Sequence, residues 1–114
     1  MNGYFIDTDE MRGREISRGI KIKLVSGERL MLSFVEISEG AGMSEHSHFH
    51  EQAGIVLEGE IEMVIGAESR KLGRGESYFI PANVPHRLRP LKYARVLDIF
   101  SPPRNDYLER TQTI

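Results

Sequence analysis

Short apolar runs separated by Gly- and Pro-rich turns make up most of the chain between Ile20 and Phe100. Ile20, Ile22 and Leu24 alternate with lysines, which predicts a strand with one face on a core and one in water. From Arg29 to Glu36 apolar residues occupy both faces, which predicts a strand buried between two layers. A sustained helical period is absent, so the pattern is typical of an all-β protein.

The remaining apolar runs predict further strands at 52–57, 61–65, 70–72, 77–80 and 93–100. We expect 52–57 and 61–65 to pair as a hairpin around Glu58-Gly59-Glu60. A small opening strand is expected at 4–6, followed by at most one helical turn, and a polar tail with one helical turn near Tyr107 closes the chain. About nine to eleven short strands in one small domain predict a sandwich or a barrel, because closure removes open edges.

A chain of 114 residues can enclose one hydrophobic core but not two. We predict a single domain over 1–114, with an N-terminal strand region at 1–19 and a C-terminal tail at 101–114.

The net charge of -2 gives no electrostatic case for nucleic acid, and the absence of cysteine excludes thiolate ligands. The first residues lack a basic segment before an apolar core, and no run reaches the length of a membrane span. We expect a cytoplasmic protein without nucleic-acid or membrane partners.

Three of the 4 histidines, His46, His48 and His50, lie at alternate positions. Side chains two residues apart on an extended chain point the same way, so His46 and His48 can bind one metal ion. His86 follows a second Gly- and Pro-rich segment and can close the site from a neighbouring strand. Gln52 offers an amide oxygen as a fourth donor, and His50 has the parity to compete with it. These donors predict one divalent transition metal, either Ni, Zn, Fe or Mn.

The same histidine segment resembles the first motif of the cupin superfamily. That motif has two histidines separated by one residue and a glutamate four or five residues later, between two glycines. The matching residues here are Gly40, His46, His48, Gln52 and Gly59. The order and spacing agree, and only the glutamate is changed, to glutamine.

The second cupin motif also has a counterpart. Its matching residues are Gly75, Pro81, Asn83, His86 and Pro90. Asn83 stands where the motif has glycine, and asparagine tolerates the left-handed backbone that such a glycine implies. The resemblance implies a cupin domain, a double-stranded β-helix or jelly-roll barrel, with a metal held by His46, His48, His86 and Gln52.

The segment from Asp98 to Leu108 resembles the C-terminal part of small bacterial cupins of the pectin-degradation type. These include an enzyme that linearises 4,5-unsaturated monouronates to 5-keto-4-deoxyuronate. The resemblance implies that Asp98 and Arg104 are catalytic, and that Phe100 and Arg104 bind a small anionic substrate. Two residues after the glutamine ligand, where we expect a polar side chain in that enzyme, this chain has Gly54.

Asp98 lies in an otherwise apolar run, and burying an unpaired carboxylate is unfavourable. Such a residue usually serves a site or pairs with an arginine. If Asp98 and Phe100 face a cavity, Leu97 and Ile99 face outward and need a cover. The cover can be a second sheet, the N-terminal strand or a second subunit, and we predict a homodimer.

Three neutral imidazoles and an amide leave the charge of a divalent metal uncompensated, which favours an anionic ligand. We therefore expect a metal-dependent enzyme that opens or isomerises a sugar-acid ring. Two alternatives stay open. The first is an iron-dependent dioxygenase, a class of enzyme that cupins with three histidine ligands also resemble. The second is a non-catalytic module that binds a small acid or sugar.

Overall fold

The computed structural model describes residues 3–112 as ten strands and two short helices. The strands are β1 (Arg14–Ser17), β2 (Ile20–Ser26), β3 (Met31–Ile37), β4 (Met43–His46), β5 (Glu51–Glu58), β6 (Glu60–Ile65), β7 (Glu68–Gly73), β8 (Ser77–Ile80), β9 (His86–Pro90) and β10 (Ala94–Ser101). The 3-10 helix η1 (Thr8–Glu10) precedes β1, and α1 (Asn105–Gln112) follows β10. The expectation of an all-β domain is confirmed.

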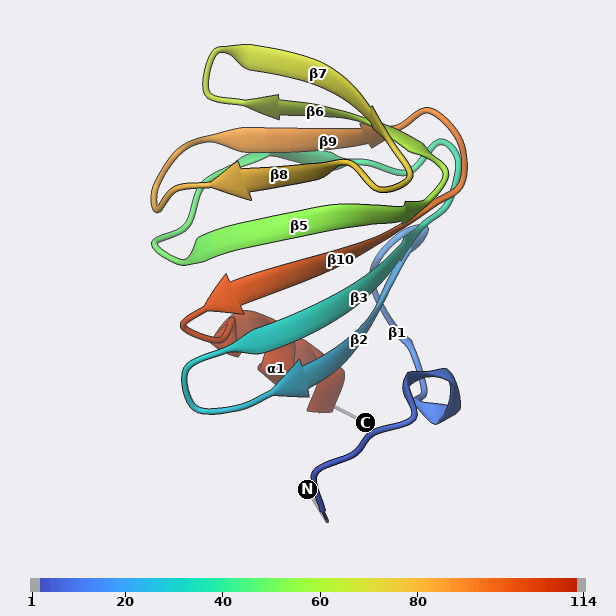
Figure 1. Cartoon of the computed structure of the whole chain (residues 1–114), viewed down its shortest axis with the longest axis vertical. Helices are drawn as coiled ribbons and strands as arrows, with labels where there is room; N and C mark the ends of the chain where they lie inside the picture. Colours follow the sequence, from blue (N-terminus) through green and yellow to red (C-terminus); the bar gives the residue numbers. More distant parts are fainter. Residues whose placement is uncertain (1–2, 113–114) are drawn as a thin grey trace.

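The strands form two antiparallel sheets, with β6, β7 and β9 of one above β5, β10, β3 and β2 of the other in Figure 1. One has six strands in the order β1-β2-β3-β10-β5-β8, and the other has four in the order β4-β9-β6-β7. The apolar core lies between them, with Val35, Val56 and Val96 from the first sheet and Ile61 and Leu88 from the second. Of the sandwich or barrel that the sequence predicts, the two sheets form the sandwich.

Strand β10 shows how the sequence period positions the interior. Its even-numbered residues are buried and Arg95 and Ile99 are exposed, because successive side chains of a strand point to opposite faces. Asp98 and Phe100 therefore face inward, as the resemblance to pectin-degradation cupins implies, and Leu97 and Ile99 face outward.

The predicted hairpin between 52–57 and 61–65 is wrong. Strand β5 pairs with β10 and β8, whereas β6 pairs with β7 and β9, so the chain passes from one sheet to the other at Gly59. Gly59 has φ +82, and a Cβ there would collide with the backbone oxygen of Tyr93. A tight turn with glycine fits a hairpin and a sheet-to-sheet crossing equally well, which is why the sequence pattern does not separate them.

The two ends of the chain differ in part from expectation. No strand covers Tyr4–Ile6 in the described structure, and Tyr4 and Phe5 are almost fully exposed. The single helical turn expected after it is η1, and the predicted turn near Tyr107 is the longer helix α1. Residues 1–2 and 113–114 of the predicted terminal regions lie outside the described residues. Neither helix within residues 3–112 has the length and apolar character that a membrane span requires.

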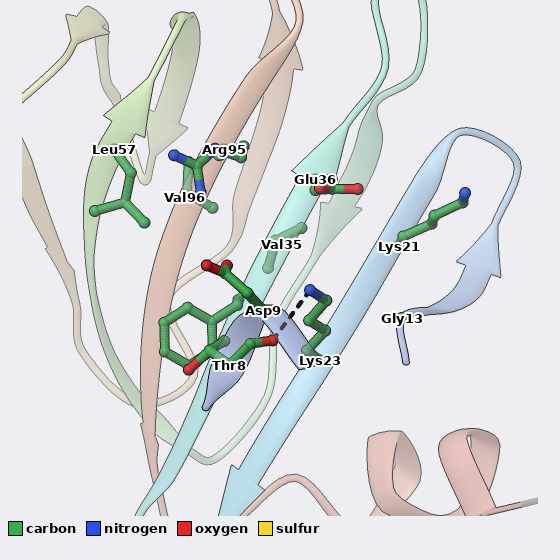
Figure 2. Close-up of a pocket in the computed structure, with 11 residues that line it drawn as sticks. Thr8, Asp9, Gly13, Lys21, Lys23, Val35, Glu36, Leu57, Arg95 and Val96 are labelled. Carbon is green, nitrogen blue, oxygen red and sulfur yellow. Dashed lines mark hydrogen bonds between the residues drawn. The ribbon is translucent and has the colours of Figure 1, made fainter. Parts of the chain in front are cut away.

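The outer face of the six-stranded sheet is only partly covered. Figure 2 shows η1 lying across it, with the Lys23 ammonium donating a hydrogen bond to the Thr8 carbonyl at 3.1 Å. A small cavity of about 90 Å³ lies there between η1 and the sheet, lined among others by Leu57 and Arg95. Farther along the same face Ile99 is 37% exposed and Phe79 is 54% exposed. The second sheet lies on the opposite side, so this apolar surface has no cover from it.

Candidate metal centre

The three histidines of the two motifs are brought together by one strand pair and one turn. His46 ends β4 and His86 begins β9, and the two residues are direct partners in the ladder. His48 lies in the loop after β4, and its carbonyl accepts a hydrogen bond of 2.7 Å from the Asn83 amide. Asn83 has φ 67, so the predicted left-handed turn is confirmed. The Asn83 turn thus ties the segment before His86 to the loop that carries His48.

The imidazoles form a compact group inside the sandwich. Ring centroids lie 4.3 Å apart for His46 and His86, 4.9 Å for His48 and His86, and 5.7 Å for His46 and His48. One ring nitrogen from each lies within 4.8 Å of the others. This spacing is suited to a single ion held between the three rings.

Backbone carbonyls fix the tautomer of each ring. Nδ1 contacts the Ser44 carbonyl in His46, the His50 carbonyl in His48 and the Val84 carbonyl in His86, at 2.8, 3.2 and 2.9 Å. A carbonyl oxygen only accepts, so the proton sits on Nδ1 and each Nε2 carries a lone pair, which in His48 faces the Gln52 oxygen. Nε2 of His86 is buried without a hydrogen-bond partner among the described residues. An unpartnered buried lone pair beside two others fits a metal ligand set, with backbone oxygens orienting the rings.

The surroundings favour the neutral form that metal binding requires. Burial, followed by the charges of Arg104 and His86, lowers the pKa of His48 from 6.5 to about 4. Burial likewise lowers the pKa of His86, against the opposing effect of the hydrogen bond to Val84. Both rings are therefore unprotonated near neutral pH, with their lone pairs available.

Gln52 lies next to this group at the start of β5. Its Oε1 is 3.2 Å from Nε2 of His48, and its side chain hydrogen-bonds the Asp98 carboxylate. Because a carboxylate only accepts, the Gln52 amide directs its NH2 group to Asp98 and its oxygen to the imidazole. His50 is buried outside the cluster of three, with its ring stacked on Phe49 at 4.1 Å. Gln52 is thus the better placed of the two candidates for a fourth ligand, which stays a prediction.

Asp98 is buried, with 6% of its surface exposed, and accepts a short hydrogen bond from the Tyr78 hydroxyl. Burial raises the pKa of Asp98 from 3.8 to about 6, although hydrogen bonds from Tyr78 and Gln52 and the charge of Arg104 oppose this. The carboxyl group therefore exchanges its proton close to neutral pH, which suits a group that both accepts and donates protons. Its direct partners are a tyrosine and a glutamine, rather than the arginine considered from the sequence.

Arg104 is buried beside the same cavity, but its guanidinium is already engaged. Nε and Nη2 donate to the two carboxylate oxygens of Asp106 at 3.0 and 2.8 Å. Its Cζ lies 4.0 Å from the ring centre of Tyr107 and 5.2 Å from that of Phe100. The guanidinium thus holds the carboxylate of Asp106 with two nitrogens, and binding of a substrate carboxylate by Arg104 stays a prediction.

These residues share one small interior cavity of about 20 Å³, close to the volume of a single water. Its lining consists of Met43, His46, Gln52, Met63, Tyr78, His86, Leu88, Asp98, Phe100, Arg104 and Tyr107. Three predicted ligands and the predicted Asp98, Phe100 and Arg104 thus meet there, and His48 joins through the imidazole group. Tyr107, on α1, packs edge-on against Phe100 with centroids 5.8 Å apart and restricts the space.

Sequence reasoning missed Tyr78, Tyr107 and Asp106 as parts of this site. Tyr78 has the same strand parity as the buried Ile80, which marks it as inward-facing. The glycine inside β5, Gly54, is a further signal, because glycine in a strand interior often marks the close approach of another group. Neither signal identifies Asp98 as the contact, since that depends on strand register.

A two-sheet β sandwich with three inward imidazoles able to hold a metal ion defines the class of this protein. Residues 33–100 match the Cupin domain family, and the chain belongs to that family.

Relatives with known names are similar along almost the whole chain. The pectin degradation protein KdgF of Dickeya dadantii (strain 3937) is 39% identical over 111 residues, covering 95% of this chain and 100% of that protein. The structure of KdgF from Halomonas sp. has a TM-score of 0.87 and 31% identity, covering 91% of this chain and 99% of that one. An RmlC-like cupin from Shewanella frigidimarina NCIMB 400 has a TM-score of 0.88 and 27% identity, covering 93% and 96%. The predicted cupin fold and the resemblance to pectin-degradation cupins are confirmed.

Proposed function

We propose that this protein is a metal-dependent enzyme that converts a 4,5-unsaturated uronate into the open-chain 5-keto-4-deoxyuronate. The observation that carries the proposal is the meeting of the imidazole group with Asp98, Phe100 and Arg104 at one cavity. Similarity to KdgF along 95% of the chain supports pectin-derived sugar acids as the substrate class.

The proposed metal is a divalent ion such as Ni, Zn, Fe or Mn, held by His46, His48, His86 and Gln52. Bound there, it supplies Lewis-acid stabilisation of negative charge on substrate oxygens. Asp98 lies beside Gln52 and lines the same cavity, so it would contact a substrate that enters there.

The proposed reaction is an isomerisation, so its atoms balance without an oxidant or reductant. The hemiacetal hydroxyl at C1 loses its proton, the bond between C1 and the ring oxygen breaks, and C4 gains a proton as the ketone forms at C5. Asp98 takes up the first proton and delivers one to carbon, a dual role for which a carboxyl with a pKa of about 6 is suited. Phe100 supplies an apolar wall beside His48, with ring centroids 5.8 Å apart.

Arg104 is proposed to bind the carboxylate of the substrate. The guanidinium already holds one carboxylate, that of Asp106, whose side chain is 54% exposed, and we propose that the substrate displaces it toward water. A substrate carboxylate can then accept the same two hydrogen bonds from the guanidinium, because one carboxylate replaces another. Because Tyr107 restricts the cavity, entry of a sugar acid also requires α1 to move outward.

The test combines elemental analysis of the purified protein with turnover of 4,5-unsaturated galacturonate, followed by loss of its ultraviolet absorbance. We expect about one divalent metal per chain and faster loss of absorbance with the metal-loaded protein than with the chelator-treated one. Metal without any turnover would refute the proposed reaction. Oxygen consumption in that case would favour a dioxygenase, and thermal stabilisation by an unchanged acid would favour a binding module.

We further propose that the protein is a homodimer joined through the outer face of the six-stranded sheet. Leu97 lies between Phe34 and Ile55 in the ladder, and Ile99 lies between Leu32 and Ala53. These outward side chains are neighbours in the ladder, and of them only Phe34 lines the cavity beside η1. A second copy is a suitable cover, because a two-fold axis buries the same patch on both subunits.

Substituting Ile99 by lysine is expected to convert the dimer into a monomer, since the charge would lie within the apolar interface. Light scattering coupled to size-exclusion chromatography measures the mass. Ser69→Lys, on an exposed position of β7 in the other sheet, is the matched control and should stay dimeric. A monomeric wild type, or a dimer that survives Ile99→Lys, would contradict the proposed interface.

A further inference from the structure

We propose that Tyr78 is a positioning residue: its hydroxyl passes over Gly54 to hold the Asp98 carboxylate, which in turn orients the Gln52 amide toward the imidazole group. The consequence for turnover rests on the proposed function, whereas the consequence for metal binding does not.

Strand register brings these residues into one row. Tyr78 on β8 is the ladder partner of Gly54 on β5, and Gly54 is the partner of Asp98 on β10. All three face inward, so Tyr78 and Asp98 are separated by one intervening strand, about 10 Å between backbones. A tyrosine and an aspartate side chain together can bridge that separation only if nothing projects from the strand between them.

Gly54 provides this open path. A Cβ built on Gly54 would collide with Cζ and the hydroxyl oxygen of Tyr78 and with Oδ1 of Asp98. The hydroxyl therefore occupies the space that any side chain at position 54 would need. Its hydrogen bond to Asp98 is short and lies in the buried interior.

The effect of Tyr78 extends to the metal site through Asp98. The carboxylate receives hydrogen bonds from both Tyr78 and Gln52, and the second of these keeps the Gln52 oxygen 3.2 Å from Nε2 of His48. On the other side of Asp98 in the ladder is Ser33, whose buried hydroxyl has no hydrogen-bond partner among the described residues. Tyr78 is thus the side chain that restrains Asp98 from within the sheet, and Ser33 offers a matched control.

Tyr78→Phe keeps the ring and removes only the hydroxyl. With Co²⁺ as the probe, we expect affinity to fall about 10-fold and the visible absorption spectrum of the bound ion to shift, because partners of metal ligands typically change affinity 10- to 100-fold. We expect kcat on unsaturated galacturonate to fall about 10- to 100-fold with little change in KM. Ser33→Ala should match wild type in all of these measurements.

Gly54→Ala tests the same link from the intervening strand. Its added methyl group should force Tyr78 and Asp98 apart. The fold reduction in Co²⁺ affinity of the double variant Gly54→Ala/Tyr78→Phe should therefore be smaller than the product of the fold reductions in the two single variants. If Tyr78→Phe leaves Co²⁺ affinity and spectrum as in wild type, the proposal is overturned. Absence of turnover in wild type would refute the proposed function alone, since the Co²⁺ measurements would still decide the role of Tyr78.

Discussion

Replacing His46 and His48 together by alanine is expected to abolish metal retention and to reduce turnover of unsaturated galacturonate to the background rate. The two rings supply two of the three Nε2 lone pairs, and one remaining imidazole with an amide is a weak site for a divalent ion. Affinity should fall by more than about 100-fold, because loss of an outer partner alone costs 10- to 100-fold. Elemental analysis after dialysis, with turnover measured on the same sample, checks both effects.

The matched control for this double variant is Ser47→Ala, which changes the exposed residue between the two histidines. Added metal should raise the Tm of wild type and of Ser47→Ala but not that of the double variant, since only ligands that bind the folded state stabilise it. Stoichiometric metal in the double variant would show that the ion is bound elsewhere.

Asp98→Asn is expected to lower kcat by about 1,000-fold, within the range attributed to general acid–base groups. The change keeps the shape of the side chain and removes its ability to exchange a proton. Metal should still load to about one ion per chain, because the three imidazoles and their backbone partners are untouched. Single-substrate kinetics and elemental analysis separate the two effects.

Asp9→Asn, at an exposed carboxylate on η1, is the control for the same chemical change away from the cavity. A kcat for Asp98→Asn within a factor of about three of wild type would remove Asp98 from the proposed proton transfers. Loss of metal together with loss of activity would instead assign Asp98 a mainly structural role.

Local spacing in the sequence predicted most of the strands and the three histidines, whereas Asp98, Phe100 and Arg104 were assigned to the site by the resemblance to pectin-degradation cupins. Alternation placed Asp98 and Phe100 on the same face of their strand, and the turn residue Asn83 adopts the left-handed backbone expected of it. Histidine spacing identified the rings that lie together. These features need only the period of a strand and the conformational preference of single residues.

Features that depend on which strands pair were not predicted. The passage from β5 to β6 uses the same turn chemistry as a hairpin, so the change of sheet at Gly59 is visible only in three dimensions. The contact of Tyr78 with Asp98 depends on β5 lying between β8 and β10, an order set by long-range pairing. The pairing of Arg104 with Asp106 was missed because the polar tail was expected to hold only one helical turn near Tyr107, and no pattern in it singled out Asp106.

The two sheets contribute different parts of the site. His46 and His86 come from β4 and β9 of the four-stranded sheet, whereas Gln52, Asp98 and Phe100 come from β5 and β10 of the six-stranded sheet. A directed-evolution library can therefore vary inward positions of the six-stranded sheet while β4 and β9 stay constant. Such a library can be screened for other acid substrates and other proton-transfer groups while the pair of imidazoles is kept. The same separation gives related proteins a route by which substrate preference can diverge.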